Sequence, residues 1–190
     1  FHTSIRPDPT NPGSQILVTV PAKVLGAEFE MRYRFTPQDQ LSLSYSYTDA
    51  TFSNVPAAFS QFMAEKKQVP GAVPHTFNAG YGHTFNLPGD SVLDVRADAR
   101  YTSAYYLDNV SEQLGQAGLA YVHVGEQWTG NLSSTWRPSD ARYAVTAYVR
   151  NVTNNRYKTF GQVQLLQPFV VASGTQNDPR TIGVVLSSSF

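Results

Sequence analysis

The chain has 190 residues, carries no net charge and contains no cysteine. A neutral chain gives no electrostatic case for a nucleic-acid partner, and the lack of thiols fits a compartment where free cysteine is avoided. No apolar run approaches the roughly 18 residues that a membrane-spanning helix needs. The chain has 15% charged and 13% aromatic residues, and a membrane-spanning β-barrel tolerates this mixture because only every second residue faces lipid.

The first part of the chain predicts a loop followed by a strand. Residues 1–5 are expected to be the tail of a strand, and three prolines and a glycine over 6–14 indicate a loop. In the next predicted strand, over 15–35, an apolar face alternates with a charged one, with Ala27, Phe29, Met31, Tyr33 and Phe35 against Glu28, Glu30, Arg32 and Arg34. A helix would spread these residues around its axis, so the period of two indicates a strand.

The same alternation recurs along the rest of the chain, and the segments between the strands alternate in length. After 15–35, the predicted strands are 41–48, 75–86, 93–102, 121–136, 143–150 and 178–190. The short turns are predicted over 36–40, 87–90 and 137–141. The long connections are predicted over 6–14, 53–74, 107–120 and 151–177, with room for a helical turn or two at 57–67. Short turns at one end of the strands and long loops at the other are typical of transmembrane barrels.

Charged side chains occupy one face of several strands, most clearly Asp94, Arg96, Asp98 and Arg100. A sandwich core cannot bury such charges at a tolerable cost. We therefore expect this face to line a wet lumen, with its charges paired across strands as a ladder. Aromatic residues near the strand ends are expected at the two membrane interfaces, namely Phe35, Tyr101, Trp128, Trp136, Tyr143 and Phe190. The sequence predicts an all-β, antiparallel transmembrane β-barrel.

Five segments occur in an order that resembles a known family. They are Leu25 to Glu30, Leu41 to Ala50, Val73-Pro74-His75, Val149 to Tyr157, and Pro179-Arg180-Thr181 through Phe190. Together they are similar to the C-terminal part of the barrel of TonB-dependent outer-membrane receptors. The fourth departs from the family in Thr153-Asn154-Asn155, where an aspartate is commoner, although the segment caps a turn either way.

The resemblance implies a barrel of about 22 strands with a plugged lumen. Residues 1–190 would be its last seven strands with the end of an eighth, without the plug domain. It implies an active transporter in the outer membrane of a Gram-negative bacterium that imports a ferric siderophore or a similar scarce ligand. The expected partners are outer-membrane lipid, the TonB complex through the missing N-terminal part, and the barrel-assembly machinery, which would recognise the terminal Phe190.

The sequence contains no catalytic constellation, so we expect no enzyme. Its four histidines have no metal-ligand spacing, and we predict no metal and no cofactor. His83 is expected at a membrane interface. Ligand contacts are expected in the outer lumen and the long loops, because aromatic rings and arginine suit a flat anionic chelate. The candidates are His75, Tyr105, Tyr106, Arg150, Tyr157, Phe160 and Gln162.

Two other interpretations stay open. A complete small outer-membrane barrel of about eight strands, with a structural or adhesive role, suits this chain length. The absence of an initiator methionine and a signal peptide before Phe1 disfavours it and indicates a C-terminal fragment. A soluble β-sandwich binding module is disfavoured by the charged strand faces.

Overall fold

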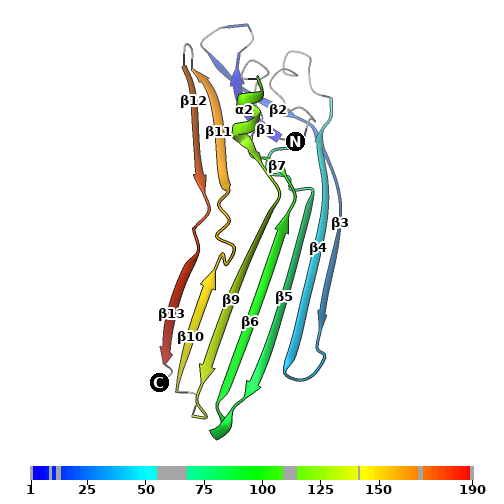
Figure 1. Ribbon diagram of the computed structural model, residues 1–190. Helices are drawn as coiled ribbons and strands as arrows, with labels where there is room; N and C mark the ends of the chain where they lie inside the picture. The colour runs from blue at the N-terminus through cyan, green and yellow to red at the C-terminus, as the bar shows by residue number, and fades with distance from the viewer. Residues whose placement is uncertain are drawn as a thin grey trace.

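The computed structural model describes residues 2–8, 10–11, 14–54, 68–108, 115–140, 142–166 and 169–188. Its main feature is an antiparallel sheet of seven strands, which we call the wall (Figure 1). The strands are β3 (Ala22–Tyr33), β4 (Asp39–Phe52), β5 (His75–Asn86), β6 (Val92–Thr102), β9 (Gln127–Arg137), β10 (Tyr143–Arg150) and β13 (Thr181–Ser188). They follow one another in chain order, and the edge strands β3 and β13 are not paired with each other. The wall is thus an open section of a barrel.

The smaller elements lie at one end of the wall, where the long connections are (Figure 1). They are the hairpin β1 (His2–Pro7) with β2 (Gln15–Val20), the pair β7 (Tyr105–Tyr106) with β8 (His123–Val124), the helix α2 (Gly115–Val122), and the hairpin β11 (Lys158–Leu166) with β12 (Phe169–Gln176). The short turns lie at the opposite end, one of them formed by η1 (Pro88–Asp90), in which Gly89 takes a φ of 72°. The predicted separation of short turns from long loops is confirmed.

Four parts of the structure differ from the sequence prediction. The strand expected over 15–35 is divided at Pro21 into β2 and β3, because proline has no N–H for the ladder. Residues 1–5 were expected to end a barrel strand, but β1 extends to Pro7 and pairs with β2 outside the wall.

The other two differences lie in the long connections. The first two residues of the strand expected over 121–136, Tyr121 and Val122, belong to α2. The rest of this helix occupies the end of the loop expected over 107–120. Its two glycines weaken helix propensity, but packing of its apolar residues on β11 outweighs that loss. The loop expected over 151–177 contains the β11–β12 hairpin. The helical turn expected at 57–67 lies outside the described residues.

The molecule has little internal core. Within the described residues, the largest fully buried side chain is Val122, which packs with Val163 beside Tyr106, Leu107 and Leu119. The wall is a single layer, so its side chains contact whatever lies against its two faces.

Candidate functional site

One face of the wall is apolar from edge to edge, and we call it the outer face. The strand register places aromatic rings opposite one another across five neighbouring strands, in the row Phe29, Tyr45, Phe77, Tyr101 and Trp128. Exposed apolar residues lie between this row and the turn end of the wall. They include Leu132, which is 46% exposed, and Ile182, which is 74% exposed. Water would make such a continuous apolar surface costly, whereas lipid matches it.

Aromatic rings mark both ends of this apolar band. Trp128 contacts Tyr101 at the loop end, with ring centroids 4.9 Å apart, and Trp136 contacts Tyr143 at the turn end, at 5.8 Å. Positions 128 and 136 lie on the same strand, so at about 3.3 Å per residue they are about 26 Å apart. This is close to the roughly 25 Å apolar band of a membrane barrel. The predicted interface positions of these four aromatic residues are consistent with this geometry.

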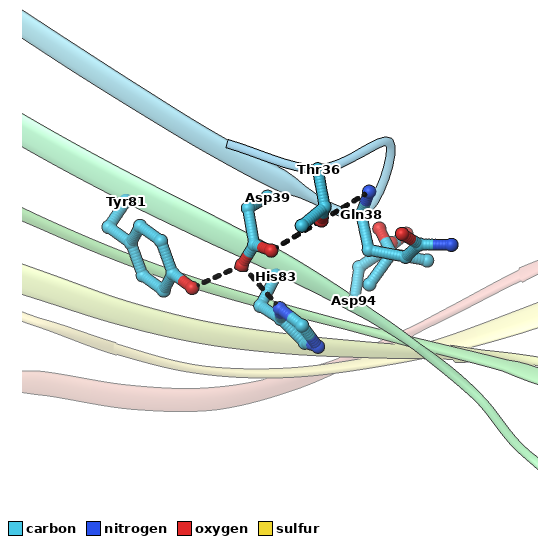
Figure 2. A network of polar contacts seen from close by, with 7 residues as sticks. Thr36, Gln38, Asp39, Tyr81, His83 and Asp94 are labelled. Atoms are coloured by element: carbon cyan, nitrogen blue, oxygen red, sulfur yellow. Dashed lines mark hydrogen bonds and ion pairs between the residues drawn. The ribbon is translucent and has the colours of Figure 1, made fainter. Parts of the chain in front are cut away.

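The outer face carries charge at its turn-end rim, and there the charge is satisfied internally (Figure 2). The Asp39 carboxylate accepts hydrogen bonds from the Thr36 hydroxyl, at 2.5 Å, and from the Tyr81 hydroxyl. The His83 Nδ1 lies 2.6 Å from the same carboxylate, and its ring packs edge-on against Phe85. His83 therefore lies on the outer face near a short turn, as expected. The network joins the β3–β4 turn to β5 rather than offering an open site.

The opposite face of the wall is polar and hollowed, and we call it the concave face. One hollow on this face has a volume of about 450 Å³ and is lined by residues that include Glu30, Arg32, Asn78, Asp98, Arg100 and Asn131. A second hollow of about 170 Å³ lies near the short turns, beside Arg34 and Arg96. Gly80 and Gly82 also face this side, as expected for small residues of a lumen wall.

The charges of the concave face form only part of the predicted cross-strand ladder. Arg96 stands opposite Gly82 and Ser133, and Arg100 stands opposite Asn78 and Thr129.

The ion pair found on this face within the described residues joins Asp94 to Arg137, while Asp98 accepts a 2.7 Å hydrogen bond from Asn131. Glu30, Arg32 and Arg100 thus make no ion pair in the described part of the chain. The ladder prediction is confirmed for Asp94 and Asp98, which have polar partners on neighbouring strands. It is wrong for Arg96 and Arg100, because the register, set by the turns, places neutral residues opposite them. These charges remain available to water, to a ligand or to another part of the protein.

An asparagine-rich turn after β10 fixes the loop end of three wall strands. Asn151 is 8% exposed and has a φ of 52°, a conformation that asparagine tolerates. Its side-chain amide donates to the backbone carbonyls of Asn155, at 2.9 Å, and Asp178, at 3.1 Å. Its own backbone N–H donates to the Asn131 side chain. The segment caps a turn, as predicted, and in addition ties β9, β10 and the approach to β13 together.

Arg150, a predicted ligand contact, is positioned by a stack on the concave face. Tyr148 stands opposite Gly183 in the ladder, and its ring lies where a side chain at that glycine would be, within 2.6 Å of a Cβ added there. The Arg150 guanidinium lies over the Tyr148 ring, 5.0 Å from its centroid. The cation is exposed near the loop end of the wall, where an anion arriving from outside can meet it.

A small unit lies at the loop end of the wall, and we call it the cap. It is made of β7, α2, β8 and β11. Tyr106 packs in its apolar cluster with Leu107 and Val122, and its ring lies 5.2 Å from His123. The Lys158 ammonium lies over the Tyr121 ring, 4.5 Å from its centroid, and donates to the Tyr121 carbonyl. The structure thus places Tyr106, another predicted contact, in the cap interior.

Tyr105, in β7, interacts electrostatically with Tyr157 and with Arg100 of the wall. Burial raises the pKa of the Tyr105 phenol, the nearby Tyr157 raises it further, and Arg100 opposes the rise. The Tyr157 backbone is held by the Asn177 side chain, which accepts its N–H at 2.9 Å. Arg100 also lines the 450 Å³ hollow and has no ion-pair partner in the described part of the chain. Arg100 was not among the predicted contacts, because its proximity to Tyr105 depends on the tertiary fold and has no local signal in the sequence.

The remaining candidates lie apart from these residues. Phe160, 49% exposed, and Gln162 occupy the face of β11 that points away from the cap, since Gly161 and Val163 face its interior. His75 lies on the outer face, where its Nδ1 is 2.9 Å from the Tyr45 hydroxyl. The structure therefore does not bring His75 to the side of the wall on which Arg100 and Arg150 lie. Phe190 lies outside the described residues.

Neither a metal cluster nor a membrane-spanning helix is found in the described residues. No group of three or more His, Asp or Glu side chains is placed to hold a metal ion. No helix in this part of the chain is both long and apolar enough to cross a membrane.

Comparison with solved structures shows a shared fold. The chain is similar to the ferric yersiniabactin uptake receptor FyuA from Yersinia pestis, with a TM-score of 0.68 and 19% identity over 87% of this chain and 23% of that one. It is similar to BauA, the ferric preacinetobactin receptor from Acinetobacter baumannii, with a TM-score of 0.64 and 14% identity over 97% of this chain and 25% of that one. Its TM-score with FpvA of P. aeruginosa, solved with pyoverdine and iron, is 0.63, with 15% identity over 97% of this chain and 22% of that one.

The chain thus spans about a quarter of the length of these structures. Comparison with the curated proteins finds no match. The family described as TonB dependent receptor-like, beta-barrel matches residues 3–152, which is most of the chain. The two-faced wall, its apolar band and this match together lead to one conclusion: the chain belongs to the β-barrel family of TonB-dependent receptors, which lie in the outer membrane of Gram-negative bacteria.

Proposed function

We propose that the chain is the C-terminal part of a receptor that imports a ferric siderophore, or a similarly scarce ligand, across the outer membrane. The observation that carries this proposal is the concave face, whose hollow is lined by charges without ion-pair partners. Exposed charges of this kind suit the polar, water-filled inner wall that a transporter needs. The solved structures with this fold include receptors for ferric yersiniabactin and ferric preacinetobactin.

The partner that we propose for the concave face is a plug domain, supplied by the part of the protein that precedes this chain. The unpaired Glu30, Arg32 and Arg100 support this, because an alternating set of charges is complemented best by a folded segment with charges of its own. The TonB complex would act on that N-terminal part. The other proposed partners are lipid around the outer face and the barrel-assembly machinery, which would act at Phe190. We propose no enzymatic activity and no resident cofactor.

The ligand contacts that we propose are those predicted from the sequence, namely His75, Tyr105, Tyr106, Arg150, Tyr157, Phe160 and Gln162, together with Arg100. The geometry favours the subset on the concave side and at the base of the cap. Tyr105, Tyr157 and Arg100 are close together, and Arg150 is stacked and exposed. Two arginines and two phenols suit an anionic chelate with aromatic groups.

Deletion of the gene in its host tests the proposal. In iron-limited medium, we expect the deletion strain to take up at least one ferric siderophore poorly, and the full-length gene to restore uptake. Alanine at both Tyr105 and Tyr157 should weaken binding, whereas alanine at Ser187, on the terminal strand, is the control. Normal uptake of every ferric siderophore by the deletion strain would contradict the proposal. An outer-membrane product of about 21.0 kDa, the mass of this chain alone, would favour the small-barrel alternative.

A further inference from the structure

Two buried polar side chains lie unpartnered at the loop end of the concave face. Thr102 is 8% exposed and Gln127 is 7% exposed. In the described structure, the Thr102 hydroxyl oxygen and the Gln127 side-chain carbonyl oxygen have no hydrogen-bond partner. Native proteins pair nearly all buried polar atoms, so two orphans in one place indicate a group that is missing.

The two side chains face each other across the ladder. Thr102 is the last residue of β6 and Gln127 is the first residue of β9, and they are direct partners in register. Opposite residues of an antiparallel pair have Cβ atoms about 4.5–5.5 Å apart, so one small group can contact both. Two residues further down each strand stand Arg100 and Thr129, which line the 450 Å³ hollow. The pair therefore lies just beyond the lining of that hollow, on the side of the cap.

The pair also lies where the cap joins the wall. Two residues separate Thr102 from β7, and two separate β8 from Gln127. Both links leave the wall at this ladder position, so the β7–β8 pair is attached to the wall through it. A group bound between Thr102 and Gln127 would touch the base of the cap and the top of the hollow at once.

The chemistry of the pair limits what it can bind. The Gln127 carbonyl oxygen only accepts hydrogen bonds, and the Thr102 hydroxyl donates one and accepts others. Arg100, next on the same face, offers a cation without an ion-pair partner within the described residues. A fitting ligand thus has an O–H or amide N–H group next to an anionic oxygen.

We propose that Thr102 and Gln127 are ligand-binding residues that hold a hydroxyl or amide N–H of an anionic ferric chelate, whose negative group pairs with Arg100. This inference rests on the proposed function and adds to it a contact that sets specificity. Because both side chains are buried, a ligand contacts the pair only when the residues that cover it move. A site that hydrogen-bonds a ligand group discriminates strongly against ligands without that group.

Affinity measurements on the full-length receptor test this. The probes are ferric yersiniabactin, ferric preacinetobactin and ferric pyoverdine, with binding followed by quenching of tryptophan fluorescence. For each chelate that the wild type binds, Thr102→Val and Gln127→Leu should raise Kd tenfold or more. Thr102→Ser, which keeps the hydroxyl, should restore Kd to within about twofold of wild type. Thr135→Val is the matched control, because Thr135 lies on the same face of β9 near the turn end, where it is paired with Thr146.

A second readout separates ligand contact from a structural role. If a trapped water merely bridges the pair, Thr102→Val and Gln127→Leu will lower the Tm of the unliganded receptor and leave Kd unchanged, which overturns the inference. If either variant fails to insert, Thr102→Val with Gln127→Met replaces it. Wild-type binding with unchanged Kd in both variants refutes the inference alone. If the wild-type receptor binds none of the three chelates, the inference is overturned. The proposed function is contradicted separately, if the receptor supports no uptake of any ferric siderophore in cells.

Discussion

The two faces of the wall share one backbone and one register, yet they are completed in different ways. On the outer face each side chain meets a like neighbour, as Tyr101 meets Phe77 and Trp128. On the concave face each charge meets a small neutral residue, as Arg96 meets Gly82. The outer face therefore needs only lipid, whereas the concave face stays incomplete until a ligand, a plug or water fills it.

The charges on the two faces show the same difference. Asp39, at the rim of the outer face, is satisfied by Thr36, Tyr81 and His83 within the chain (Figure 2). Arg100, on the concave face, is not paired with a carboxylate in the described residues. Charge near lipid is neutralised locally because desolvation is costly there, whereas Glu30, Arg32 and Arg100 in the lumen have no ion-pair partner in the described residues.

The largest expected effect comes from an arginine placed on either face at the same height. Leu132 lies midway between Trp128 and Trp136 on the outer face, and Ser133 is its neighbour on the concave face. Leu132→Arg should destabilise the full-length barrel by about 2–4 kcal/mol, because the charge lies near the bilayer midplane. Ser133→Arg should cost less than about 1 kcal/mol, since water reaches that face. Denaturant unfolding in lipid vesicles measures both, and equal costs would remove the distinction between the faces.

Loss of the Asn151 side chain should affect both faces together. Its amide joins the backbones at Asn155 and Asp178, and this helps to set how β10 and β13 align. Asn151→Ala should destabilise the barrel by about 2 kcal/mol, because two backbone carbonyl groups lose the amide that donates to them. Asn151→Asp should cost at least as much, because a carboxylate oxygen would face the same two carbonyl oxygens. Chemical denaturation of both variants checks this, and wild-type stability of the alanine variant would show that the turn does not anchor the strands.

A side chain at Gly183 should disturb the concave face alone. Gly183→Val places methyl groups where the Tyr148 ring lies, so the ring and the Arg150 cation stacked on it must move. We expect a cost of about 1–2 kcal/mol from overpacking. Tyr148→Ser should relieve it, so that the double variant is more stable than the two single costs predict. Strict additivity in this double-mutant cycle would contradict the packing that we describe.

The smallest effect is expected at the rim of the outer face. Asp39→Asn keeps one side-chain oxygen, which can still accept from Tyr81, and replaces the other, which accepts from Thr36, with an amide that donates. The Thr36 hydroxyl can turn to accept from that amide, so the Tm should change little. Asp39→Ala removes the acceptor and should lower the Tm measurably, since the β3–β4 turn loses its tie to β5. Thermal unfolding of the two variants distinguishes them. A larger loss for Asn than for Ala would mean that the negative charge itself matters at this rim.

The sequence predicts the wall well and the loop end poorly, for a physical reason. Along β3, the alternation of Phe29 with Glu30 reports two environments directly, because side chains of a strand point to opposite faces. The α2 helix has no such local signal, since Gly115 and Gly118 weaken it and its stability comes from packing on β11.

Among the candidate site residues too, those with a local sequence signal could be predicted and those that depend on packing could not. Arg150 was predicted because its residue type and its place at a strand end suit an anion. Thr102 and Gln127 gave no signal, because their burial and their missing partners are properties of the folded structure and not of the local sequence.

Spin labels on β6 test the central claim most directly. The 190 residues contain no cysteine, so single cysteines can be placed in this part of the full-length receptor at every position from 93 to 101 and labelled in lipid vesicles. We predict that odd positions collide with dissolved oxygen and that even positions collide with a water-soluble nickel chelate, in strict alternation along the strand. Equal access of both reagents at neighbouring positions would contradict a wall with one face in lipid and the other in a wet lumen.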